Sequence, residues 1–275
     1  MVQHQDEAIA MIHFIHGISL AFVFSGFVVG FLVGMTGVGG GSLMTPLLII
    51  LFGVAPEKAV ATDLVYASLT KTGGSLIHAL NKTIDWRIVR RLAIGSIPGA
   101  VATLAVLYFS HANTKAINMI VTHMLAVALM LTAIALIFRK WLLANYQRRV
   151  GTLSNETTMR FTVLTGLMLG VLVTLSSVGA GALGVTALIL LYPELPIVKI
   201  AGSDIAHAVP LTLIGGLGHS LMLGPLNGDM LVSLLVGSLP GIFISSYIAP
   251  RIPDTALRIV LACTLILVSV KLMTA

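Results

Sequence analysis

Apolar runs long enough to cross a lipid bilayer follow one another along most of this chain, separated by short polar or basic segments. A spanning helix needs about 20 predominantly apolar residues. Runs of this kind cover roughly residues 9–35, 92–108 and 116–138, and the chain after residue 160 retraces the same order. The pattern predicts an all-α polytopic membrane protein.

A glycine-rich segment interrupts this pattern, and a related segment follows about half a chain later. The apolar run after the first segment, at residues 47–54, is too short to cross a bilayer and predicts a half-helix or one arm of a re-entrant hairpin. Thr45 is expected to cap this short helix, with Pro46 at its first position.

Unwound backbone and a helix N-terminus at membrane depth both present free N–H groups, which suit an anion. We therefore expect the two segments to meet and bind one small anion, whereas a pair of turns without a ligand is the alternative interpretation. The expected binding residues are Thr36, Gly37, Gly39, Gly40, Gly41, Ser42, Ser176, Ser177, Gly179 and Gly181.

The two halves of the chain repeat one another. Asp63 corresponds to Asp204 at a spacing of 141, and the Gly-Ser-x-Pro-Gly pentad at residues 95–99 recurs at residues 237–241. Such ordered agreement is the signature of an internal duplication. The sequence predicts two homologous transmembrane repeats, residues 1–138 and 161–275, joined by a cytoplasmic linker at residues 139–160. Each repeat is expected to hold a glycine-broken re-entrant or short helical hairpin and three transmembrane helices.

The positions of the basic residues predict how the repeats are oriented. The segment after the polar helix of the first repeat carries Arg87, Arg90 and Arg91, whereas its counterpart at residues 222–229 has no Lys or Arg. Because cytoplasmic loops are enriched in basic residues, equivalent loops are expected on opposite sides of the membrane. This indicates an inverted repeat with both termini in the periplasm. Parallel repeats are the competing interpretation.

A single lysine stands out in the polar helix predicted at residues 59–80. Lys71 lies nine or more residues from either end, or about 13 Å deep, which is too deep for its ammonium group to reach the surface comfortably. A lysine at this depth needs a partner, since charged side chains are costly inside a bilayer. We expect Lys71 to bind the anion or to pair with Asp63.

Buried carboxylates and histidines often carry protons in membrane proteins. The two repeat-related aspartates each follow a lysine by five residues, so a structural ion pair is the alternative for them. A hydrogen-bonded structural role is the alternative for the two histidines. The candidates for proton coupling are Asp63, His78, Asp204 and His219.

Composition excludes several functional classes. Only 9% of the residues are charged and 57% are hydrophobic, and the 16 Lys and Arg cluster beside apolar runs, which argues against nucleic-acid binding. The glycine segment is not followed by Lys-Ser or Lys-Thr, so it is not a nucleotide-binding P-loop. With one cysteine, Cys263, and no metal-ligand motif, we expect neither an enzyme nor a bound metal or cofactor.

The chain resembles the TauE/SafE sulfite-exporter-like membrane transporters. The resemblance rests on the ordered motifs Gly37-Val38-Gly39-Gly40-Gly41, Pro46-Leu47-Leu48, Ala59-Val60-Ala61-Thr62 and Ile84-Asp85-Trp86-Arg87, together with His78 and the second copy of most of these.

This resemblance implies a multi-pass transporter of the bacterial cytoplasmic membrane. It implies proton-coupled secondary active transport of small sulfur-containing oxyanions such as sulfite or organosulfonates. The alternatives are an anion channel without proton coupling, or a transporter of thiosulfate, sulfate or a carboxylate. The expected partners are the small anion, protons and the lipid bilayer, and an oligomer is compatible with the sequence.

Overall fold

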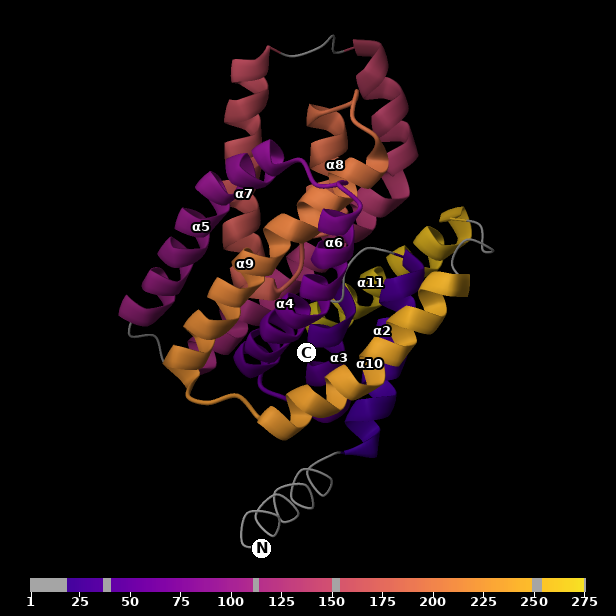
Figure 1. Cartoon of the computed structure of the whole chain (residues 1–275). Coiled ribbons are helices and arrows are strands. Elements are labelled where there is room, and N and C mark those ends of the chain that lie inside the picture. Colours follow the sequence, from indigo (N-terminus) through magenta and orange to yellow (C-terminus); the bar gives the residue numbers. More distant parts are fainter. Residues whose placement is uncertain (1–18, 37–40, 111–113, 150–153, 249–253, 275) are drawn as a thin grey trace, which may run out of the picture.

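The computed structural model describes residues 19–36, 41–110, 114–149, 154–248 and 254–274, and their regular secondary structure is α-helical throughout (Figure 1). The helices in chain order are α2 (Leu20–Thr36), α3 (Gly41–Phe52), α4 (Pro56–Leu80), α5 (Trp86–Phe109), α6 (Thr114–Arg149), α7 (Asn155–Ser176), α8 (Ala182–Leu191), α9 (Ile197–Leu223), α10 (Gly228–Ile248) and α11 (Asp254–Thr274).

Six helices among the described residues are long and apolar enough to cross a membrane: α5, α6, α7, α9, α10 and α11. The helices α3 and α8 are short and apolar, as the short run at residues 47–54 predicted. The chain is therefore a multi-pass, all-α membrane protein, which confirms the predicted fold class at this level.

Helices from the two halves of the sequence pack against one another. We call each such pair, with one helix from the first half and one from the second, a crossed pair. Helix α2 packs along α10, and α5 packs along α7. The polar helices α4 and α9 pack against each other in the middle, and they run in opposite directions (Figure 1). As a result, the α4–α5 connection lies at one end of the molecule and the α9–α10 connection at the other.

Glycines allow the crossed pairs to approach closely. A Cβ atom at Gly95 of α5 would collide with the backbone of α7 at Val163 and Leu167, and one at Gly237 of α10 would collide with the backbone of α2 at Val23. Without a side chain, the backbones of two helices can come into direct contact, a packing mode common in membranes.

Replacing Gly95 by leucine is expected to separate α5 from α7 and to destabilise the protein by about 1–3 kcal/mol, the usual cost of overpacking. Gly73→Leu in α4 is the matched control, because a Cβ there meets no atom within 4 Å. Thermal unfolding in detergent should show a lower midpoint for the first variant only. Equal midpoints for the two variants would contradict this account of the α5–α7 contact.

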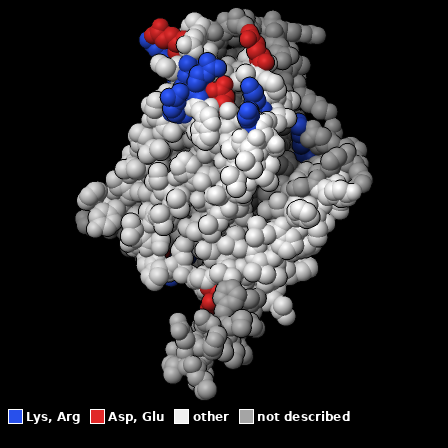
Figure 2. Space-filling view, viewed as in Figure 1, with Lys and Arg blue, Asp and Glu red and all other residues white. Residues whose placement is uncertain are grey.

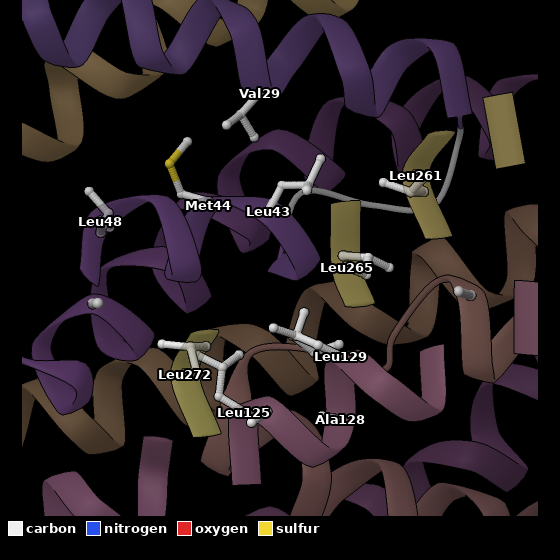
Figure 3. Packing of buried hydrophobic residues seen from close by; sticks show 14 of the residues in the cluster. Val29, Leu43, Met44, Leu48, Leu125, Ala128, Leu129, Leu261, Leu265 and Leu272 are labelled. Carbon is white, nitrogen blue, oxygen red and sulfur yellow. The ribbon is translucent and has the colours of Figure 1, made fainter. Parts of the chain in front are cut away.

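A large apolar cluster joins the short helix α3 to α6 and α11. It includes Met44, Leu48, Leu125 and Leu265, which are fully buried (Figure 3). The figure shows these side chains directed from several helices toward a common interior. Burial of this apolar surface, through close packing of neighbouring helices, fixes one face of α3 and leaves its N-terminal turns directed at α4.

One local prediction needs correction. Helix α3 begins at Gly41, so Thr45 lies in its second turn and does not cap it, and Pro46 lies inside the helix. The hydroxyl of Thr45 instead binds a side chain of α4 (described below). Helix α6 continues to Arg149 and α7 begins at Asn155, so both helices extend into the segment predicted as the linker.

Candidate functional site

The second glycine segment is an unwound turn between α7 and α8. Ser177, at the end of α7, has a left-handed backbone (φ 58°), and Gly179 and Gly181 have φ of 125° and 126°. Glycine adopts positive φ without steric cost. The turn closes through hydrogen bonds from Gly184 N to Gly179 O (3.1 Å) and from Val185 N to Gly181 O (2.9 Å). Helix α8 therefore starts inside the molecule, where Gly181 and Ala182 are buried.

The first glycine segment is described only at its borders. Helix α2 ends at Thr36 and α3 begins at Gly41, while the side chain of Thr36 and the predicted ligands Gly37, Gly39 and Gly40 lie outside the described residues. Ser42, in the first turn of α3, is buried. The start of α3 is therefore internal, like the start of α8.

A buried carboxylate from α4 contacts α3. Asp63 is 0% exposed, and its Oδ2 accepts hydrogen bonds from the Thr45 backbone N–H (3.2 Å) and from the Thr45 hydroxyl. The Ser177 hydroxyl of the other glycine turn lies beside the same carboxylate without reaching hydrogen-bond geometry. Asp63 thus lies between the two interrupted segments, whereas the side chain of Lys58, five residues earlier, is exposed.

Its counterpart Asp204 faces the start of α8 from α9. Asp204 is also 0% exposed, and a Cβ atom at Gly184 would collide with its Oδ1. Neither carboxylate oxygen has a partner in hydrogen-bond geometry among the described residues, although the backbone N–H of Gly181 lies beside the carboxylate. The two aspartates therefore differ, because Asp63 accepts two hydrogen bonds whereas Asp204 has only this looser contact.

Lys71 reaches the second glycine turn from α4. Its Nζ donates a hydrogen bond of 3.1 Å to the carbonyl oxygen of Ala180. Along α4 it lies between Ser68, whose hydroxyl binds Val209 O of α9, and Gly74, which lies against Ile205 of α9. This register places Lys71 beside the part of α9 that carries Asp204, and the ammonium interacts electrostatically with Asp204 and with Asp63.

Two further buried residues belong to this cluster and were not predicted as site residues. His207 is 1% exposed, and its Nε2 lies 2.7 Å from the Ser96 hydroxyl of α5. Tyr66, at the equivalent position of α4, is 1% exposed and lies beside Ser238 of α10. Both follow an aspartate by three residues, so they share its helix face. That spacing, together with the aromatic side chain at each position, was the signal available in the sequence.

The predicted histidines lie apart from one another. His219 is buried, and its Nε2 lies 2.8 Å from the Thr174 carbonyl oxygen, near the end of α7. His78 is near the end of α4, where its Nδ1 lies 2.8 Å from the Thr83 hydroxyl. Only His219 is therefore close to a glycine turn. Ser176 donates to the Leu172 carbonyl at 2.6 Å, which ties its hydroxyl to its own helix.

Charged side chains gather at one end of the visible face, whereas the middle of that face is almost free of charge (Figure 2). Asp85, at the start of α5, accepts a hydrogen bond from the Arg87 backbone at 2.9 Å. Burial raises the pKa of Asp85, but the Arg87 hydrogen bonds and charge outweigh burial and hold the pKa below its ordinary value. The uncharged middle is the part that lipid tails would cover.

A cavity opens near the end of the molecule where α9 meets α10. It has a volume of about 490 Å³ and is lined in part by Lys58, Thr62 and Asn227. A second cavity of about 280 Å³, lined in part by Asp85, Arg91 and Tyr192, contains the sequence counterpart of Asn227, namely Asp85. The α4–α5 and α9–α10 connections, which have equivalent places in the two halves, therefore each border a cavity.

Charged and hydroxyl side chains buried at interrupted helices, inside a bundle of membrane-spanning helices, are features of solute transporters. The chain belongs to the TauE/SafE family, because the family model described as "Sulfite exporter TauE/SafE" matches residues 22–272. The family resemblance predicted from the motifs is therefore confirmed.

Relatives carry names of the same class. The chain is 38% identical over 255 residues to the probable membrane transporter protein YjnA of Bacillus subtilis (strain 168), covering 92% of this chain and 99% of the relative. It is 26% identical over 234 residues to the probable membrane transporter protein YdhB of the same organism, covering 84% of this chain and 91% of the relative. No solved structure matches the chain significantly. The protein is a membrane transporter of the TauE/SafE family.

Proposed function

We propose that this protein is a proton-coupled secondary transporter of small sulfur-containing oxyanions, such as sulfite or organosulfonates, in the bacterial cytoplasmic membrane. The observation that carries the proposal is the position of Lys71. The residue is half-buried, and its ammonium group reaches the unwound turn at which α8 begins. An ammonium and a helix N-terminus are both suited to an oxyanion.

The family supplies the substrate class, since its model is described as a sulfite exporter. The proposed anion site comprises Lys71, the turn at Ser177, Gly179 and Gly181, and the first turn of α3. Proton coupling is supported by the burial of Asp63 and Asp204 beside this site. Carboxylates that are buried at membrane depth are expensive to keep ionised, and proton relays use them for that reason.

The crossed helix pairs support an inverted repeat. Residues 1–138 and 161–275 would be the two repeats, because each contributes a short helix, a polar helix and the partner of a crossed pair. The α4–α5 and α9–α10 connections lie at opposite ends of the molecule, and the basic residues of the first support a cytoplasmic location. In this orientation both termini would lie in the periplasm, and the alternating-access motion would expose the site to each side in turn.

Purified protein in proteoliposomes tests the proposal. Uptake of radiolabelled sulfite, thiosulfate, sulfoacetate, sulfate and acetate is measured with and without an imposed pH gradient. We expect saturable uptake of at least one sulfur oxyanion that exceeds acetate uptake and accelerates when a pH gradient is imposed. Non-saturable flux that follows only the membrane potential would identify a channel, and preference for acetate would reject the substrate class.

A further inference from the structure

Unsatisfied polar atoms are concentrated around the proposed anion site. Eight buried side-chain atoms in the described part of the chain lack a hydrogen-bond partner, and seven of them belong to residues in or beside this cluster. The seven atoms are Asp63 Oδ1, Tyr66 Oη, Thr174 Oγ1, Ser177 Oγ, Asp204 Oδ1, Asp204 Oδ2 and His207 Nδ1. Buried polar groups are normally satisfied, so this concentration marks a place where protons, ions or a solute bind.

Asp204 is the least stabilised member of the cluster. It is fully buried, and neither of its oxygens has a donor in hydrogen-bond geometry although the Gly181 N–H lies beside it, whereas Asp63 keeps one oxygen bound to Thr45. An ionised carboxylate without donors is strongly disfavoured in a low-dielectric interior, and a proton or a nearby cation removes the penalty. The nearby cation is Lys71, whose strongest carboxylate interaction is with Asp204.

The charges of the three groups do not balance. With both carboxylates ionised, one ammonium and two carboxylates carry a net charge of −1, which repels an anion. One proton on Asp204 brings the net charge to zero and leaves only the weaker interaction of Lys71 with Asp63 to compete with the anion. The anion would then gain more of the attraction of the ammonium group, and by reciprocity the bound anion would favour the protonated carboxyl group.

We propose that Asp204 and the transported anion compete for the charge of Lys71, so that a proton on Asp204 and an oxyanion at Lys71 bind together. This inference rests on the proposed function and adds how the proton is coupled to the anion. The proton and the anion cross the membrane in the same direction, and Asp204 carries the proton.

Other titratable groups in the described cluster are placed so that they do not take over this role. On α4, Asp63 is held by Thr45, and Tyr66 is buried beside Ser238. On α9 itself, His207 is bound to Ser96 of α5 and His219 to the Thr174 carbonyl of α7. The residues that α7 and α8 present to Asp204 and Lys71, including Ala180, Gly181 and Gly184, are uncharged.

The test measures anion exchange and accumulation in proteoliposomes between about pH 5.5 and 8. Radiolabelled thiosulfate and sulfoacetate are the probes, because their charges stay nearly constant over this range. For the wild type, the half-saturating concentration at equilibrium exchange is expected to fall as the pH falls, by up to about tenfold per pH unit when one proton is coupled.

Asp204→Asn imitates the protonated state. We expect it to exchange both probes with a low, pH-independent half-saturating concentration and to lose accumulation driven by a pH gradient. Glu156→Gln, which removes an exposed carboxylate at the start of α7 and outside the site, is the comparison variant, and it should keep the pH dependence of the wild type. Gly184→Ala supplies an independent readout, because its methyl group would press on Asp204 Oδ1, favour the neutral carboxyl group and move the pH dependence to higher pH.

Three results would overturn the inference: wild-type pH dependence in Asp204→Asn, a half-saturating concentration that rises as the pH falls, or coupling to Na⁺ with no effect of pH. If Asp204→Asn does not yield folded protein, an unchanged pH profile in Gly184→Ala is decisive against the inference. Absence of wild-type exchange for the whole anion panel would instead reject the proposed function, so the two failures are distinguishable.

Discussion

Lys71→Met is expected to lower sulfur-oxyanion flux in proteoliposomes by about 100-fold or more. An anion that occupies the site without the Lys71 ammonium group is a buried charge without its partner, which costs about 3–5 kcal/mol. Each ~1.4 kcal/mol is a factor of ten. Methionine keeps a flexible, unbranched side chain of similar length, so the packing between α4 and α9 should survive.

The same substitution should leave the stability of the protein nearly unchanged. It removes the roughly 2.5–3.5 kcal/mol cost of a lysine inside the bilayer, and this gain offsets the loss of the ammonium group beside Asp204 and Asp63. An unfolding midpoint close to that of the wild type, together with a lost flux, would separate a binding role from a folding defect. Lys115→Met, at the exposed start of α6, is the control and should leave flux unchanged. Flux within about threefold of the wild type in Lys71→Met would contradict the proposed role of the ammonium group.

Gly181→Ala is expected to reduce flux by about tenfold or more, because the residue has a backbone conformation that a side chain strains by about 1–3 kcal/mol. Its φ of 126° and ψ of −92° lie where α8 begins, one residue after the carbonyl that holds Lys71. Relief of the strain would move that carbonyl and the first N–H groups of α8. Initial rates of anion uptake per folded molecule measure the effect.

The control for this variant is Gly224→Ala at the end of α9. Gly224 also has positive φ (85°), and a Cβ atom there meets nothing within 4 Å. Both variants should lose stability, whereas only Gly181→Ala should lose flux. If the two lower flux equally once expression is corrected, the turn at α8 has no special role in transport.

The fold class was accessible from local information. Runs of apolar residues report spanning helices directly, since only a helix satisfies the backbone inside lipid. The correspondence of Asp63 and Asp204 could be predicted from the spacing of similar motifs in the two halves. The residues that interact with these aspartates were harder to predict, because Asp63 binds Thr45, 18 positions away, and His207 binds Ser96, 111 positions away.

Thr45 illustrates why local rules fell short. The residue before a proline is a good helix start by local preference, yet α3 begins four residues earlier, where buried contacts with α4 and the apolar cluster support it. Tyr66 and His207 were missed for a related reason. Their neighbours Ser238 and Ser96 come from the opposite half of the chain, and no periodicity along one helix encodes that crossing.

Helices from the two halves of the sequence pack together in pairs, and this packing affects which parts of the molecule can move as units. The glycine contacts hold α2 against α10 and α5 against α7 so closely that each pair would shift as one body, although each pair joins helices from both halves of the sequence. The bodies that move together would then not coincide with the two predicted repeats. A hinge would be sought where α4 and α9 cross near Ser68 and Val209, not at the connection between α6 and α7.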